Sequence, residues 1–218
     1  MTNWIILRAA GIGAYLMLFL AVSWGLVGTT GALGKRVSKA SATTVHQFMS
    51  TCGLVLLGVH IGGLLIDRFL PFAPADLLVP GHASYKPIPV AFGIVAMYAM
   101  VFVVVLSWLR RQIGMKWWRR SHLLAVPLFS TSLVHGVFTG TDSARPWMWP
   151  VYLVTGVVTF FLVVVRGLTV GYRPERPPRP ERATRPARRA EVDPDLDREL
   201  ERLEMQELQG TAVEPAGG

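Results

Sequence analysis

Five long runs of apolar residues dominate the sequence and limit what it can fold into. A run of about 20 apolar residues is long enough to cross the hydrocarbon core of a bilayer as a helix. Of the 218 residues 51% are hydrophobic and 17% are charged, whereas soluble domains carry about 25% charged residues, so a soluble enzyme is disfavoured. The sequence predicts an all-α integral membrane bundle of five transmembrane helices, near residues 5–27, 45–66, 90–109, 122–139 and 151–168.

The first run could also be a signal peptide, because Arg8 precedes an apolar stretch near the N-terminus. Its apolar stretch is longer than a usual signal-peptide core, and no small-residue cleavage site follows it. We therefore interpret the first run as a membrane span.

Lys and Arg residues concentrate in two of the four connecting segments, residues 28–44 and 110–121. The alternate segments contain only Arg68, Lys86 and Arg145. Cytoplasmic loops are rich in these residues, so the pattern predicts an outside N-terminus and a cytoplasmic C-terminus in the plasma membrane. Before residue 171 there are thirteen Lys and Arg against three acids, and this placement fits membrane topology better than nucleic-acid binding.

The composition changes after the last apolar run. We expect three regions: a five-helix membrane domain at 1–170, a Pro/Arg-rich disordered linker at 171–192, and an acidic tail with a short helix at 193–218. The arginines of the linker are expected to contact anionic lipid. The tail helix is either solvated or a docking segment for a cytoplasmic partner. The single cysteine, Cys52, excludes an internal disulfide and a CxxC site.

Four of the five histidines lie in two of the predicted spans, where an ionisable side chain is costly and suggests a function. His46 and His60 are 14 residues apart, which places them about 21 Å apart in depth and about 40° apart around a helix. His122 and His135 are 13 residues apart on a helix that runs parallel to the first. His46 therefore faces His122, and His60 faces His135, at matched depths. Two such pairs predict axial ligands of two stacked b-type haems.

Some features fit this prediction less directly. Thirteen residues of straight helix turn His135 by roughly 140° from His122, so we expect a kink at Pro127 between them. Glycines beside the histidines either leave room for a flat macrocycle or serve helix packing; they are Gly53, Gly58, Gly62, Gly63 and Gly136. Basic residues near the span ends are either haem-propionate partners or topology signals; they are Lys35, Arg36, Arg68, Arg119 and Arg120.

The pattern H-x13-H on one span and H-x12-H on the next but one resembles the ferric reductase-like transmembrane domain, shared by ferric reductases, NADPH oxidases and bacterial methionine-sulfoxide-reductase haem subunits. The resemblance covers roughly residues 4–170, and the LLAVPLFSTSLVHGVFTGTD segment is similar to short bacterial members. It implies that His46, His60, His122 and His135 bind two haems. Unlike the larger members, this sequence has only a short tail after the last span and lacks their additional N-terminal span.

The leading hypothesis is a b-type cytochrome that carries electrons across the membrane to an outer-face acceptor. Because no flavin- or nucleotide-binding module is present in the sequence, the donor would be a separate cytoplasmic flavoprotein or a quinol. Whether the chain is itself an enzyme stays open. The alternatives are a haem-free membrane scaffold with structural histidines, a transporter with a histidine proton relay, and a quinol-oxidising subunit similar to cytochrome b. His82 is expected to be a plain surface residue.

Overall fold

The computed structural model describes residues 2–30, 37–67, 71–169 and 194–210. All regular secondary structure in these residues is helical. Five segments are long and apolar enough to cross a membrane, as the sequence predicts. They are α1 (Thr2–Thr30), α2 (Lys39–Ile66), α4 (Pro87–Trp108), α8 (Met148–Thr169), and a fourth span made of α6 (Met115–His122) and α7 (Ala125–Thr139). Two short helices, α3 (Pro74–Leu78) and α5 (Arg110–Ile113), lie in connecting segments, and α9 (Pro194–Gly210) follows the bundle.

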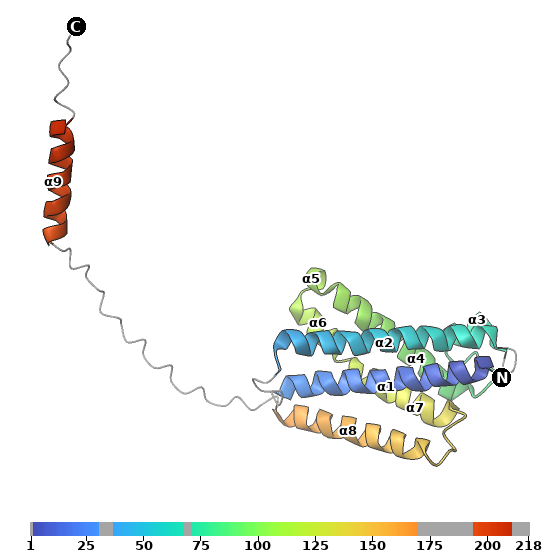
Figure 1. Ribbon diagram of the computed structural model, residues 1–218. Coiled ribbons are helices and arrows are strands. Elements are labelled where there is room, and N and C mark those ends of the chain that lie inside the picture. Colours follow the sequence, from blue (N-terminus) through green and yellow to red (C-terminus); the bar gives the residue numbers. More distant parts are fainter. Residues whose placement is uncertain (1, 31–36, 68–70, 170–193, 211–218) are drawn as a thin grey trace, which may run out of the picture. The chain divides into compact units, whose positions relative to one another are not determined.

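Helix α1 is the centre of the bundle (Figure 1). It packs along α2 on one side and along α8 and α7 on the other, while α4 packs mainly along α7. Close approach of α1 and α2 depends on Gly63, because a Cβ there would lie 2.9 Å from the Cβ of Leu7. Helix α2, which carries His46 and His60, does not pack closely against α6 or α7, which carry His122 and His135.

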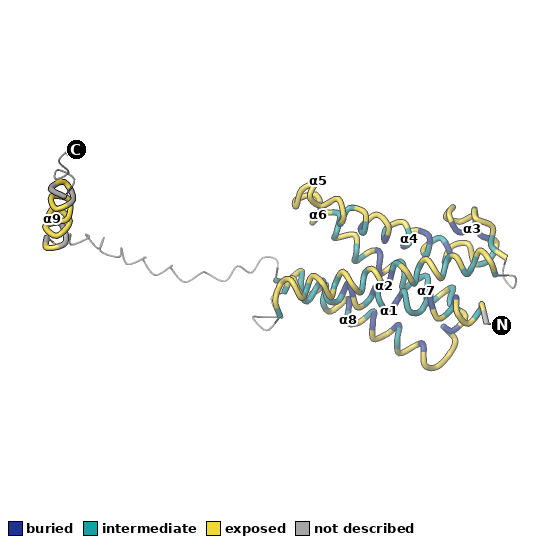
Figure 2. Tube along the Cα trace, turned by 45° about the horizontal axis from the view of Figure 1, so that its top comes forward, coloured by how far each residue is buried: buried dark blue, intermediate teal, exposed yellow. Residues whose placement is uncertain are grey.

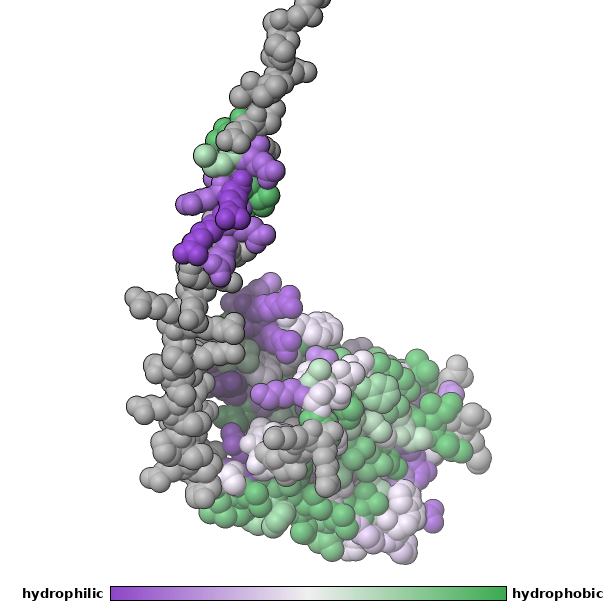
Figure 3. Space-filling view, turned by 60° about the vertical axis from the view of Figure 1, so that its left-hand side comes forward, coloured by the Kyte–Doolittle hydropathy of each residue, from purple (hydrophilic) through white to green (hydrophobic). Residues whose placement is uncertain are grey.

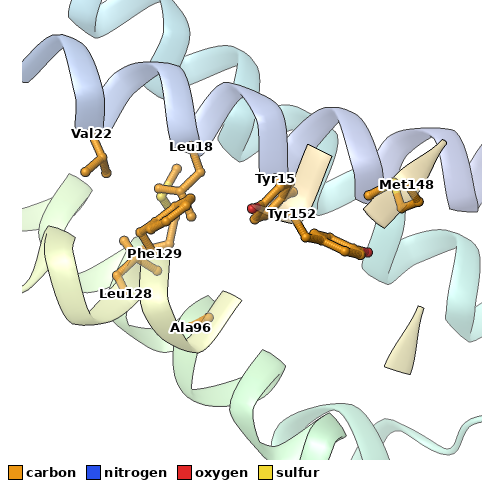
Figure 4. Packing of buried hydrophobic residues seen from close by; sticks show 9 residues of the cluster. Tyr15, Leu18, Val22, Ala96, Leu128, Phe129, Met148 and Tyr152 are labelled. Carbon is orange, nitrogen blue, oxygen red and sulfur yellow. The ribbon is translucent and has the colours of Figure 1, made fainter. Parts of the chain in front are cut away.

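The core of the bundle is a cluster of aromatic and aliphatic side chains from α1, α4, α7 and α8 (Figure 4). Tyr15 stacks on Phe129 with ring centroids 5.7 Å apart and meets Tyr152 edge-on at the same distance. The hydroxyl of Tyr15 forms a hydrogen bond with that of Thr155, which ties α1 to α8. The hydroxyls of Tyr15 and Thr155 thus have partners within the bundle, as an apolar surrounding requires.

The outward faces of the long helices are exposed and apolar (Figures 2 and 3). Exposed leucine, valine, isoleucine and phenylalanine side chains occur along α2, α4 and α8. An apolar surface of this extent is costly in water and favourable in lipid. The surface therefore agrees with a multi-pass membrane protein.

The fourth span is interrupted at Leu123 and Leu124, not at Pro127. The N–H groups of Leu123, Leu124 and Val126 reach carbonyls three residues back, as in a 3₁₀ turn. Pro127 lacks the N–H that would bond to the carbonyl of Leu123, and it lies in the first turn of α7, where proline is tolerated. The tighter turn adds about 20° of rotation per residue, which reduces the angular mismatch between the two histidines of this span.

Helix α9 forms a unit of its own. It carries an excess of acidic residues, and the side chains of Leu200, Leu203 and Leu208 are exposed. The predicted linker at 171–192 lies outside the described residues.

Candidate functional site

The structure brings the first histidine pair, His46 of α2 and His122 of α6, into contact. Their ring centroids are 5.8 Å apart and their planes are inclined by 65°. A first-row metal binds an imidazole nitrogen at about 2 Å, so one metal ion fits between two rings at about this separation. The first pair therefore has the spacing of two ligands on opposite sides of one metal.

The second histidine pair, His60 of α2 and His135 of α7, lines one cavity of about 230 Å³. Apolar side chains from α1, α2, α4, α7 and α8 form most of its wall. Because α2 and α7 do not pack closely, their histidines approach each other across this cavity rather than across a helix contact. A largely apolar cavity with a few polar groups is typical of a cofactor site.

Three of the four histidines form the same hydrogen bond with a neighbouring helix. In each, ring atom Nδ1 lies beside a backbone carbonyl, and because a carbonyl only accepts, Nδ1 is the donor. The proton on Nδ1 leaves Nε2 unprotonated and free to bind a metal, and such a bond also orients the ring. The bonds join His46 to Ala21 at 3.0 Å, His60 to Leu7 at 2.9 Å and His135 to Pro89 at 2.9 Å.

Each of these carbonyls lies four residues before a glycine. In a helix each of these carbonyls already accepts a hydrogen bond from the N–H of that glycine. The imidazole therefore reaches the carbonyl from the side of the helix, close to the position that a Cβ on the glycine would occupy. A Cβ on Gly93 would lie 2.5 Å from Nδ1 of His135, and one on Gly11 would lie 2.8 Å from Nδ1 of His60. At Gly25 the nearest atom of His46 would be 3.6 Å away, which is ordinary contact. The two glycines of the second pair therefore make room for the imidazoles.

His122 differs from the other three histidines. Its Nδ1 is buried without a hydrogen-bond partner among the described residues. Its ring stacks on Trp118 of the same helix, with centroids 5.1 Å apart and planes inclined by 29°. Trp118 in turn donates a hydrogen bond from Nε1 to Oγ of Ser107 at 3.2 Å, which links α6 to α4. Stacking, rather than a hydrogen bond, holds this ring.

A charged pair, Arg8 and Asp142, lines the second cavity. Arg8 of α1 donates to Asp142 in the α7–α8 loop, with Nε 2.8 Å from Oδ2 and the second contact between Nη2 and Oδ1. Both residues line the cavity, and Asp142 is buried. Of the basic residues expected near haem propionates, Lys35, Arg36 and Arg68 lie outside the described residues, while Arg119 and Arg120 lie on α6.

The donor set of each site consists of two imidazoles. Among the described residues, no three His, Cys, Asp or Glu side chains gather closely enough to hold a metal ion. Two ligands are fewer than the four of a structural zinc site, whereas an iron that already has four porphyrin nitrogens needs only two more. The paired imidazoles thus fit a haem better than a bare metal ion.

The glycines singled out in the sequence do not line the histidine rings. A Cβ on Gly63 would meet Leu7, one on Gly53 would meet Met17 and Met100, and one on Gly136 would meet Tyr152, so all three lie at helix contacts. Gly58 and Gly62 have no atoms within 4 Å of the position of a Cβ. Gly53 and Gly136 also line the second cavity, whereas Gly58, Gly62 and Gly63 do not, so the macrocycle interpretation stays a prediction for these two glycines alone.

The glycines that do contact histidines were missed, although a signal was present. Gly11 and Gly25 on α1 are 14 residues apart, which is the spacing of His46 and His60 on α2. Because α1 and α2 are consecutive and antiparallel, equal spacings bring each glycine beside one histidine. Arg8 had no comparable signal, since its partner Asp142 lies 134 residues away in the sequence.

The remaining histidine, His82, is exposed as expected, but it is not isolated. Its Nδ1 donates a hydrogen bond to Oδ1 of Asp76 at 2.7 Å. This bond holds the pKa of the Asp76 carboxyl below its ordinary value of 3.8, and the backbone N–H of Ala73 lowers it further. His82 thus supports the start of α3 and lies apart from the two pairs.

A scan against protein-family models, a search of curated proteins and a search of solved structures each returned no match. The similarity to the ferric reductase-like transmembrane domain therefore stays a prediction from the histidine spacing.

Proposed function

We propose that the chain is a b-type cytochrome that binds two haems and carries electrons across the membrane. The observation that carries the proposal is the repeated arrangement around His46, His60 and His135, in which Nδ1 donates to a carbonyl and Nε2 is left for a metal. His46 and His122 would hold one haem, and His60 and His135 the other. When bound, each haem supplies reversible one-electron chemistry.

The protein groups have separate tasks in this proposal. The carbonyls of Leu7, Ala21 and Pro89 fix the tautomer and orientation of three imidazoles. The surrounding core excludes water from the path between the two sites. Arg8 lines the cavity of the second pair and is available to an anionic propionate, in competition with Asp142.

The direction of transfer follows from the predicted topology. With the C-terminus in the cytoplasm, the first pair lies toward the cytoplasm and the second toward the outside. A cytoplasmic flavoprotein or a quinol would reduce the first site, and an acceptor at the outer face would oxidise the second. The plasma membrane is the proposed location, and the arginines at 171–192 are proposed to contact anionic lipid.

Single histidine variants test the pairing. The full chain is purified with haem, and the low-spin bis-imidazole signal is measured by electron paramagnetic resonance. We expect His60→Ala and His135→Ala to remove the same half of the signal, and His46→Ala and His122→Ala to remove the other half. His82→Ala is the control and should leave the signal unchanged. A signal that survives intact in all four variants, or the loss of different halves within one pair, would contradict the assignment.

A further inference from the structure

The four histidines are not held equally, and the difference singles out one of them. Three have a hydrogen bond from Nδ1 to a carbonyl of a neighbouring helix, at 2.9 to 3.0 Å. Such a bond orients the ring and makes the imidazole a stronger donor to a metal. Nδ1 of His122 has no such partner among the described residues, although the atom is buried.

A buried polar atom without a partner is unfavourable, and water would satisfy it if the ring moved outward. For His46, His60 and His135 the same movement would break an existing hydrogen bond. Release of the ring from a metal therefore costs no hydrogen bond at His122, whereas at each of the other three histidines it costs one.

Helix α6, which carries His122, is also the shortest of the three helices that carry a paired histidine. Helix α6 has eight residues and lies between Gly114, whose φ is 80°, and the interruption at Leu123 and Leu124. His46 and His60, by contrast, lie within the 28 residues of α2. The side-chain hydrogen bond from Trp118 to Ser107 links α6 to α4.

On these grounds we propose that His122 is the replaceable ligand of the first site, where a small uncharged ligand such as carbon monoxide takes its place on the iron. The inference rests on the proposed function. In the ferrous protein, Nε2 of His122 would give up its bond to iron and keep the electron pair, and the carbon of the ligand would bind iron in its place. No electron is gained or lost. His46, whose ring is held by the carbonyl of Ala21, would stay bound.

Carbon monoxide binding to the full-length, haem-loaded protein in mild detergent tests the proposal. After reduction with dithionite we expect one carbon monoxide per chain, which is half of the haem, with a rate that becomes independent of ligand concentration because release of His122 limits it. His122→Ala should convert this slow phase into fast binding of the same amount.

The stacking residue gives a matched pair of variants on the same helix. Trp118→Ala removes the ring on which His122 stacks and should speed the limiting phase about two- to tenfold, the ratio that corresponds to the loss of one aromatic pair. Trp118→Phe retains a stacking ring and separates stacking from the hydrogen bond to Ser107, so its rate should stay near that of the unmodified protein. The exposed neighbour Trp117 is the control, and Trp117→Ala should leave the rate unchanged.

The outcomes separate this inference from the function on which it rests. Two haems per chain with no carbon monoxide bound, binding to both haems, or a slow phase that persists in His122→Ala would overturn the inference and leave the cytochrome in place. A limiting rate that Trp118→Ala and Trp117→Ala change equally would also overturn it. A chain that binds no haem would overturn the proposed function itself, and the inference with it.

Discussion

Substitution of Gly93 by alanine is the sharpest perturbation that the structure offers at the second site. The added Cβ would lie 2.5 Å from Nδ1, 2.6 Å from Cε1 and 2.8 Å from Cγ of His135. Ordinary contact begins at 3.4 Å, so the closest distance falls short by 0.9 Å. The ring, which is not a flexible chain end, has to move away from α4 as a whole.

The required movement is large compared with what a metal site tolerates. Metal–ligand distances vary by about 0.2 Å, and the displaced ring would also lose its hydrogen bond to Pro89. Loss of such an outer-shell bond alone lowers metal affinity about 10- to 100-fold. The bundle should still fold, because overpacking costs about 1–3 kcal/mol and alanine regains about 1 kcal/mol of helix propensity over glycine. We therefore expect Gly93→Ala to lose the haem of the second site and to keep that of the first.

Haem titration of the detergent-solubilised chain, followed by absorbance and electron paramagnetic resonance, measures this loss. Gly25→Ala is the matched control, because its Cβ would be 3.6 Å from His46, in ordinary contact, and both haems should remain. Full haem affinity at both sites in Gly93→Ala would show that the space left by Gly93 is not needed to position the imidazole of His135. That result would refute the reasoning.

Two further predictions concern groups outside the histidine pairs. Tyr15→Phe removes the hydrogen bond to Thr155 and should destabilise the bundle by about 1 kcal/mol, and a double-mutant cycle with Thr155→Val in detergent unfolding should show coupling, whereas additive effects would contradict the contact. Because the pKa of Asp76 is lower in the fold than its ordinary 3.8, its support of α3 should be complete above pH 3.8 and lost as the pH falls through the folded value. A carboxyl-carbon NMR titration measures that pKa, which should rise in His82→Ala; a midpoint at or above 3.8 in the unmodified protein would contradict the assignment.

The spans and the depth of the histidines could be predicted because both depend only on position along a helix. Apolar length determines where helices form in a membrane, and a rise of about 1.5 Å per residue determines depth. The contact between His46 and His122 agrees with that reasoning. Orientation in the membrane stays a prediction, since it depends on charge asymmetry between loops and part of those loops, residues 31–36 and 68–70, lies outside the described residues.

What could not be predicted depends on how each helix is rotated about its axis. The sequence does not specify which side of α2 faces α1, so the contact between Gly63 and Leu7 could not be predicted. The interruption of the fourth span was predicted at Pro127, but it lies before the proline. Proline has no N–H, so the carbonyl four residues earlier loses its helical hydrogen-bond donor. The link between Arg8 and Asp142 depends on a loop conformation that has no periodic signal.

The central claim is that the two histidine pairs bind two haems, and counting haem tests it most directly. The full chain is expressed with added haem and purified in mild detergent, haem per chain is measured by pyridine haemochrome, and oxidised and dithionite-reduced spectra are recorded. The account predicts two low-spin b-type haems per chain. A folded, monodisperse chain without haem would contradict it and would favour the haem-free scaffold.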